Sequence, residues 1–246
     1  MKLTKKSYNR RMFALGALLF LSIGLVSTGF AAFVMSKGAS QDLGGNIQVG
    51  TITDGSVKIE NLAYDGANKI LFEAAKDDDQ GQVKWDENNP TQFENLTVTL
   101  TGEVSPINYV DSITISLTSS SAGIEAAAAP EKAYIELPEC WKSPVEITDL
   151  TRKSEDTSSS DYNVYVFSYD IKFKWGKAFN YENPSIFLDR DDAKDGAAYS
   201  FEEKRDIMFD FKKTIYAMDA STTIEDAFAM SADIPFTATI SVTSKV

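Results

Sequence analysis

The sequence predicts an all-β fold, an antiparallel β-sandwich of the jelly-roll or immunoglobulin-like kind, with one or two short helices inserted before the last strand. Three observations predict this class. Apolar and polar residues alternate with a period of two in several segments rich in Val, Ile, Thr, Phe and Tyr, as in strands with one buried face. Turn-forming residues separate these segments. Long helical patterns do not alternate with the strands, which disfavours a parallel α/β sheet.

The alternation is clearest in residues 92–104 and 109–120, where aliphatic residues share one face and Thr or Ser occupy the other. Such faces suit a solvated antiparallel sheet. Residues 102–108, with Pro106, predict a hairpin loop between the two strands. The aliphatic positions are Leu96, Val98, Leu100, Ile113, Ile115 and Leu117.

The remaining strands are predicted from shorter or less regular patterns. In residues 57–63, Leu62 is out of phase with Val57 and Ile59, which predicts a bulge near Asn61. The segments 133–138, 162–175 and 234–244 complete the set. The polar segment 151–161 is predicted to be a mobile hairpin loop, with a domain linker as the alternative.

Capping signals predict helices late in the chain. Ser200 and Glu203 have the spacing of a capping box before residues 201–218, and Thr222 with Glu225 repeats it. Asn183 before a proline is typical of the start of a one-turn helix at residues 185–188. We expect these helices to cover one end of the sandwich.

Composition restricts the function. The chain has 246 residues, a net charge of −12, no histidine and a single cysteine, Cys140. Catalytic Ser-His-Asp or Cys-His arrangements are therefore excluded, as is an internal disulfide. Removing the five basic residues of positions 1–31 leaves 19 basic and 36 acidic residues, a net charge of −17. Such a surface repels phosphate backbones, so we expect no nucleic-acid partner. Because histidine and any nucleophile motif are lacking, we also expect no enzymatic activity.

The first 31 residues have the layout of a signal peptide. Basic residues 1–11 precede an apolar run at 12–26, and the small residues Gly29 and Ala31 follow two positions apart. We expect cleavage between Ala31 and Ala32. The alternative is an uncleaved membrane anchor at residues 12–35, which is long enough to span a bilayer.

The stretch "STGFAAFVMSKGASQDLGGNIQVGTI" resembles the export region of the TasA/camelysin group of secreted Gram-positive proteins. The shared pattern is Ala-Ala-Phe at the cut, a polar spacer, and then Asn46 and the Val-Gly-Thr at 49–51. Val34, Met35 and Ser36 depart from the acidic or Asn-rich residues usual after the aromatic. The resemblance covers the N-terminal 50 residues. It implies processing by a SipW-type signal peptidase and a sandwich domain that assembles into extracellular fibres of a biofilm matrix.

The acidic loop "DDAKDGAAYSFE" is a weak calcium candidate. As a twelve-residue calcium loop it places Asp191 at position 1, Asp195 at position 5 and Glu202 at position 12. Position 3 is Ala193, which offers no side-chain oxygen. The alternative is an acidic surface loop that leads into a capped helix. No other cofactor is expected.

Aromatic residues near the end of the strand at 162–175 offer a ligand platform. Trp175, Phe179 and Tyr181 are placed to stack on sugar rings if they face solvent. Aromatic residues on strands are more often part of a core, so core packing is the competing interpretation.

Together these patterns predict a secreted structural protein of the cell surface or extracellular matrix. Its expected organisation is a signal peptide at 1–31, a flexible arm at 32–45 and one β-sandwich domain at 46–246. The arm is expected to join copies by β-strand addition, so the partners are the chain itself or other matrix proteins, besides the signal peptidase. The alternative function is a carbohydrate-binding or adhesion module with glycans as partners.

Overall fold

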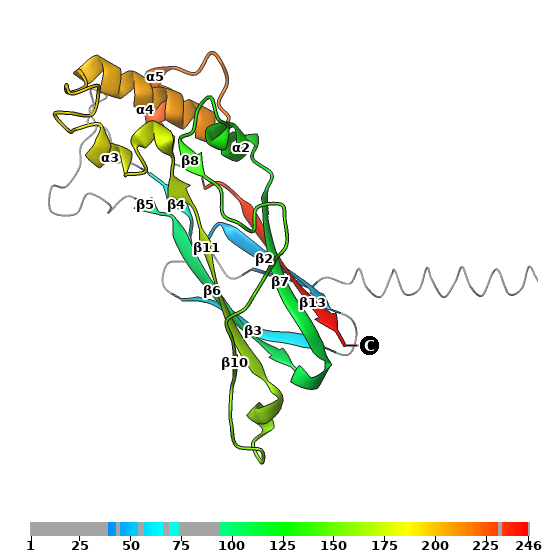
Figure 1. Cartoon of the computed structure of the whole chain (residues 1–246). Helices are drawn as coiled ribbons and strands as arrows, with labels where there is room; N and C mark the ends of the chain where they lie inside the picture. Colours follow the sequence, from blue (N-terminus) through cyan, green and yellow to red (C-terminus); the bar gives the residue numbers. More distant parts are fainter. Residues whose placement is uncertain are drawn as a thin grey trace, which may run out of the picture.

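The computed structural model describes residues 39–42, 45–53, 57–65, 69–73, 94–230 and 233–245. These residues form mostly β-strands with a few short helices. The two largest sheets run along an elongated body, and the helices gather at one end of it (Figure 1).

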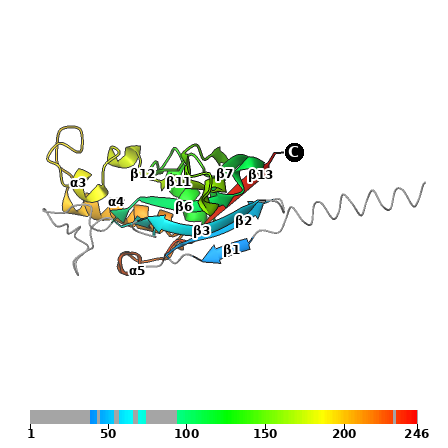
Figure 2. The same ribbon diagram turned by 90° about the horizontal axis from the view of Figure 1, so that it is seen from below.

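The first sheet has five strands in the order β1-β2-β13-β7-β9. Neighbouring strands are antiparallel except for β2 and β13, which run parallel. The C-terminal strand β13 lies between β2 and β7. At the edge of the sheet, β1 lies along β2 (Figure 2). The strands are β1 (Ala39–Asp42), β2 (Ile47–Thr53), β7 (Val110–Ser119), β9 (Val145–Glu146) and β13 (Phe236–Ser244).

The second sheet has four antiparallel strands in the order β10-β11-β6-β3. They are β3 (Lys58–Asp65), β6 (Thr97–Ser105), β10 (Leu150–Arg152) and β11 (Tyr165–Lys172). Two short pairs extend this part of the structure: β4 (Leu71–Phe72) with β5 (Glu94–Asn95), and β8 (Ile135–Glu136) with β12 (Lys174–Trp175).

The predicted hairpin at residues 102–108 is wrong. Strand β6 pairs with β3 and β11, whereas β7 pairs with β13 and β9 in the other sheet. Pro106 and the 3₁₀ turn Ile107–Tyr109 carry the chain from one sheet to the other. A short loop after an alternating strand serves equally for a hairpin or for a crossing between sheets, so the local sequence does not distinguish them.

The predicted alternation and the bulge are confirmed. Buried and partly exposed residues alternate along β6, and the aliphatic residues of β7 and β13 point inward in the same way. The register of β3 against β6 shifts between Glu60 and Ala63, and Asn61 between them has a φ of 51°. The segment 153–164 connects β10 to β11, as expected for a hairpin loop.

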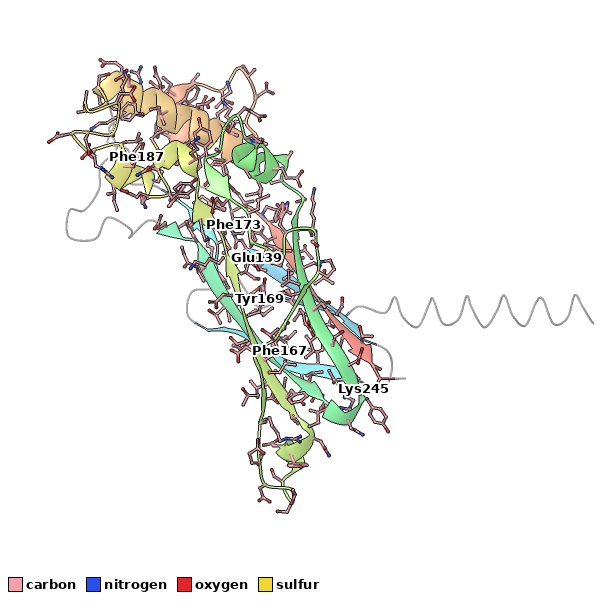
Figure 3. All side chains as sticks on the ribbon, in the orientation of Figure 1. Glu139, Phe167, Tyr169, Phe173, Phe187 and Lys245 are labelled. Carbon is pink, nitrogen blue, oxygen red and sulfur yellow. The ribbon has the colours of Figure 1, made fainter. Side chains whose placement is uncertain are left out.

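Buried side chains of both large sheets belong to one hydrophobic core. The rings of Phe173, which follows β11, and Phe236 of β13 lie 5.4 Å apart. Phe167 and Phe173 lie along the middle of the domain (Figure 3). The core thus joins residues that are far apart in sequence, which is the condition for a single folded unit.

Four α-helices are described: α2 (Ala122–Ala128), α3 (Pro184–Phe187), α4 (Phe201–Ile215) and α5 (Ile224–Ala229). The capping box of Ser200 and Glu203 is confirmed at α4, and Asn183 caps α3. The second predicted cap is wrong by one position, because Thr223 rather than Thr222 accepts from Asp226.

Helix α2 was not predicted. Its seven residues are mostly Ala and carry little amphipathic signal, and its position is set by close packing on α4. A Cβ on Gly123 would lie 2.2 Å from the carbonyl oxygen of Ile215, so only glycine permits this approach. Among the described residues, no helix combines the length and the apolar character needed to cross a membrane.

Candidate functional site

A groove opens along one side of the second sheet, next to β11. Its volume is about 520 Å³. One wall is β11 itself, and the other is the segment between β8 and β10. Its lining residues are Glu136, Leu137, Pro138, Glu139, Glu146, Thr148, Asp149, Ser168, Tyr169, Asp170, Lys172 and Lys174.

The groove exists because the segment between β8 and β10 does not pair with β11. Residues 145–146 pair with β7 in the first sheet instead. At one end of the groove the Ser168 amide donates to the Asp149 carbonyl at 3.4 Å, and at the other end Lys174 pairs with Glu136. Between these two points, the described residues include no strand beside β11 on this side.

Two residues of β11 face this opening with their backbone groups. In an antiparallel strand, alternate residues direct their N–H and C=O groups to the same neighbour. The Ser168 N–H donates to Asp149, next to β10, so the backbone N–H and C=O groups of Asp170 and Lys172 point to the same side of β11. The groove therefore presents an open strand edge.

The groove is acidic. Glu136, Glu139, Glu146, Asp149 and Asp170 line it with only two lysines. Within the described part of the chain, none of these five carboxylates forms an ion pair. The groove therefore carries more negative than positive charge, with five carboxylates against Lys172 and Lys174.

The inner side of the groove is formed by Tyr169, close to Glu139 (Figure 3). Tyr169 is hydrogen-bonded to the thiol of Cys140, which is completely buried. Burial raises the pKa of the Cys140 thiol, and burial also raises the pKa of the Tyr169 hydroxyl. Both groups are neutral at physiological pH, so this pair contributes shape and hydrogen bonding but no thiolate nucleophile.

The structure does not assemble the predicted aromatic platform. Trp175 is 4% exposed and Phe179 is completely buried, whereas Tyr181 is 59% exposed. The Trp175 ring makes edge-on contacts with Phe179 and Phe211 at 5.7 and 5.5 Å. The competing interpretation, core packing, is therefore correct for Trp175 and Phe179. Phe211 of helix α4 packs against both Trp175 and Phe179. The alternation of residues along the strand does not reveal this cover.

The carboxylate of Glu94 holds this aromatic region to β5. It accepts hydrogen bonds from the Trp175 indole N–H and from the Asn183 amide at 2.7 Å. Asn183 in turn caps α3 by accepting from Ser185 at 2.8 Å. Burial raises the pKa of Glu94, although the two hydrogen bonds oppose the shift.

The predicted calcium ligands are also not brought together. In the described residues there is no group of three or more Asp, Glu, His or Cys side chains able to hold a metal ion, so Asp191, Asp195 and Glu202 do not form such a group. Lys194 and Ala197 bridge a tight turn in which Asp195 and Gly196 both have positive φ. The acidic loop therefore serves as a turn that leads into the capped helix α4.

The predicted cleavage site, Ala31 and Ala32, and the alternative anchor at 12–35 lie outside the described residues. The predicted arm at 32–45 is described at Ala39–Asp42 and at Gly45. Residues 39–42 are paired with β2 as an edge strand, so this part of the arm is not free in the structure.

The groove was not predicted from the sequence. On the long predicted strand at 162–175, the alternate charged residues Asp170, Lys172 and Lys174 were the visible signal in the sequence. The opposite wall was not recognisable, because it depends on where residues 137–148 cross to the first sheet. No family model, no curated protein and no solved structure matches this chain.

Proposed function

We propose that the chain is a secreted structural protein of the cell surface or extracellular matrix, that its two large sheets pack as a β-sandwich, and that copies join by β-strand addition. The observation that carries this proposal is the place of β1. It is a four-residue strand at the edge of the first sheet and pairs only with β2 among the described strands. The residues that precede it lead directly to the expected cleavage site.

An edge strand of this kind can be exchanged between copies. The pairing of Ala39–Asp42 with Gln48–Thr51 can form equally well with the same strand of a neighbouring copy. The backbone hydrogen bonds that break when one strand detaches form again with the incoming strand, which makes exchange a low-cost route to assembly. One-way exchange produces a chain of subunits rather than a closed dimer.

Residue Asn46 marks where the exchangeable segment ends. Its side-chain amide donates to the Ile70 carbonyl at 2.8 Å, and its side-chain oxygen accepts from the Ile70 amide at 3.0 Å. Its own carbonyl accepts from Phe236 at 2.8 Å. Asn46 is buried, so these bonds fix the start of β2 while leaving β1 on the N-terminal side of the fixed point.

Strand exchange can be tested with cysteine pairs. Ser40 and Gly50 are directly opposite in the β1–β2 register, within the usual reach of a disulfide. A Cβ at Gly50 lies 3.9 Å from the Thr239 hydroxyl, so a side chain fits there. Mixing S40C and G50C chains under oxidising conditions is expected to produce a disulfide-linked heterodimer, measured by non-reducing gels and mass spectrometry.

The matched control mixes S40C with Q48C, because Gln48 pairs with Asp42 and is out of register with Ser40. Deletion of residues 32–45 is expected to abolish fibres seen by electron microscopy, and N-terminal sequencing of the secreted protein is expected to begin at Ala32. Fibres that persist after the deletion, or that form without any S40C–G50C heterodimer, would show that strand addition through β1 is wrong.

The alternative function, glycan binding, is less well supported by the structure than by the sequence. Trp175 and Phe179 are in the core, and Tyr181 is the one platform residue that is exposed. Glycan-array binding that disappears in Tyr181→Ala would favour this alternative over a purely structural role.

A further inference from the structure

We propose that the acidic groove beside β11 binds an extended, lysine- or arginine-rich segment of another protein. This site lies on the second sheet, whereas β1 lies at the edge of the first sheet. The inference therefore does not depend on strand exchange between copies.

The open edge determines the conformation of the partner. Backbone groups of Asp170 and Lys172 face the groove between the closed positions at Ser168 and Lys174. With a rise of about 3.3 Å per residue, this interval is roughly 20 Å long. A short extended segment fits along it and supplies the missing backbone partners, as in other cases of strand addition.

The other open edge of the same sheet is less suitable. No described strand pairs with the outer side of β3. Its register is broken between Glu60 and Ala63, with Asn61 in the left-handed region. Bulges of this kind twist an edge and discourage pairing. The edge of β11 has no such break over its eight pairs with β6.

The charge of the groove determines the chemistry of the partner. Four carboxylates come from the segment opposite β11, at Glu136, Glu139, Glu146 and Asp149, and none has an ion-pair partner in the described part of the chain. In an extended segment, every second side chain points the same way. Alternate lysines or arginines therefore face this wall together.

A second copy of the chain does not fit this requirement. The arm at 32–45, which is proposed to join copies, contains one lysine and one aspartate, so it offers the carboxylates of the groove no excess of positive charge. A metal ion does not fit either, since the described residues lack a group of three possible ligands. Charge complementarity thus selects a different, cationic protein segment.

The direct test measures binding of a fluorescein-labelled eight-residue peptide of alternating Lys and Thr by fluorescence anisotropy. The variant E139Q/E146Q is expected to weaken its Kd by about fivefold, from the usual strength of exposed charge pairs. The control variant E202Q/E225Q removes two exposed carboxylates at the helical end, with the same change in net charge. It is expected to change Kd by less than about twofold.

The backbone edge can be tested separately at Lys172. Lys172→Pro removes an N–H that faces the groove without removing a bond to β6. Lys172→Thr removes the same positive charge and keeps the N–H. Since loss of a lysine favours a cationic peptide, Lys172→Thr is expected to bind as tightly as the wild type or tighter, and Lys172→Pro more weakly. Circular dichroism is used to check that both variants are folded. If Lys172→Pro is unfolded, the carboxylate variants still test the proposal.

Four outcomes would overturn the proposal. Equal weakening in the two double glutamine variants would mean attraction to the acidic surface as a whole. If a Glu/Thr peptide binds as tightly as the Lys/Thr peptide, charge does not select the partner. If the two Lys172 variants are both folded and bind the peptide equally, the backbone edge of β11 does not contribute to binding. Self-association that E139Q/E146Q abolishes in sedimentation velocity would assign the groove to a second copy.

Discussion

Replacing Gly102 by alanine tests how closely the second sheet is packed. Gly102 lies in the middle of β6, directly opposite Phe167 of β11. A Cβ at this position would lie 2.6 Å from Cζ of Phe167 and 2.7 Å from Cδ2 of Leu62. Non-bonded carbon atoms prefer separations of about 3.5–4.0 Å. The added methyl group therefore requires the ring and the leucine to move by about 1 Å.

The expected loss of stability follows from two opposing effects. Overpacking of a well-packed core costs about 1–3 kcal/mol. Alanine is favoured over glycine within a strand by about 0.5–1 kcal/mol, because the unfolded chain has less conformational freedom to lose. The free energy of unfolding should thus fall by roughly 1–2 kcal/mol, and Tm by about 2–4 °C for each kcal/mol in a chain of this length.

The measurement is urea unfolding of the chain from residue 32 onward, followed by circular dichroism and by tryptophan fluorescence. The matched control is Gly50→Ala, because a Cβ there meets only the Thr239 hydroxyl at 3.9 Å. That variant should be as stable as the wild type or more stable by up to about 1 kcal/mol. If Gly102→Ala is not destabilised, or if both variants lose the same stability, the packing argument is wrong.

Three further predictions concern charged and capping residues. Because the pKa of Glu94 is raised from 4.5, its contribution to stability is present below about pH 4.5 and is lost as the pH rises through the folded pKa. The stability of the wild type relative to Glu94→Gln should therefore fall as the pH rises, as measured by urea unfolding at several pH values; a constant difference would contradict this. Ser200→Ala should lower the unfolding free energy by about 1 kcal/mol, because it removes the bond from Ser200 to the Glu203 amide; an unchanged midpoint in urea would count against the cap. Millimolar calcium should leave Tm unchanged, because Asp191, Asp195 and Glu202 do not form a ligand group; an increase in Tm would restore the calcium interpretation.

Much of the β-structure was predictable because one-sided burial leaves a period-two pattern in the sequence. The faces of β6, β7, β11 and β13 and the bulge at Asn61 follow this rule. The start of α4 was predictable for a different reason, since Ser200 and Glu203 satisfy local backbone groups of their own helix. Each of these features depends on residues within a few positions of one another.

The features that were wrong or missed depend on distant contacts. Whether the loop around Pro106 closes a hairpin depends on the partners of β7, which are β13 and β9. Whether Trp175 and Phe179 face solvent depends on α4, more than 20 positions later in the chain. The local pattern around these residues is the same in either case.

By itself, the sequence determined the longer strands, which face of each of them is apolar, where the main helix begins and how strongly acidic the chain is. These properties depend on local periodicity, local capping and composition. Only the tertiary structure decided that β6 and β7 belong to different sheets, that the aromatic residues at 175 and 179 are core, and that β11 has an open edge in an acidic groove. The physical reason is that each of these features depends on residues far apart in the chain, as where residues 145–146 pair with β7 of the first sheet and leave β11 without a described neighbour along the groove. Such choices are made by long-range pairing and burial rather than by any neighbouring residue.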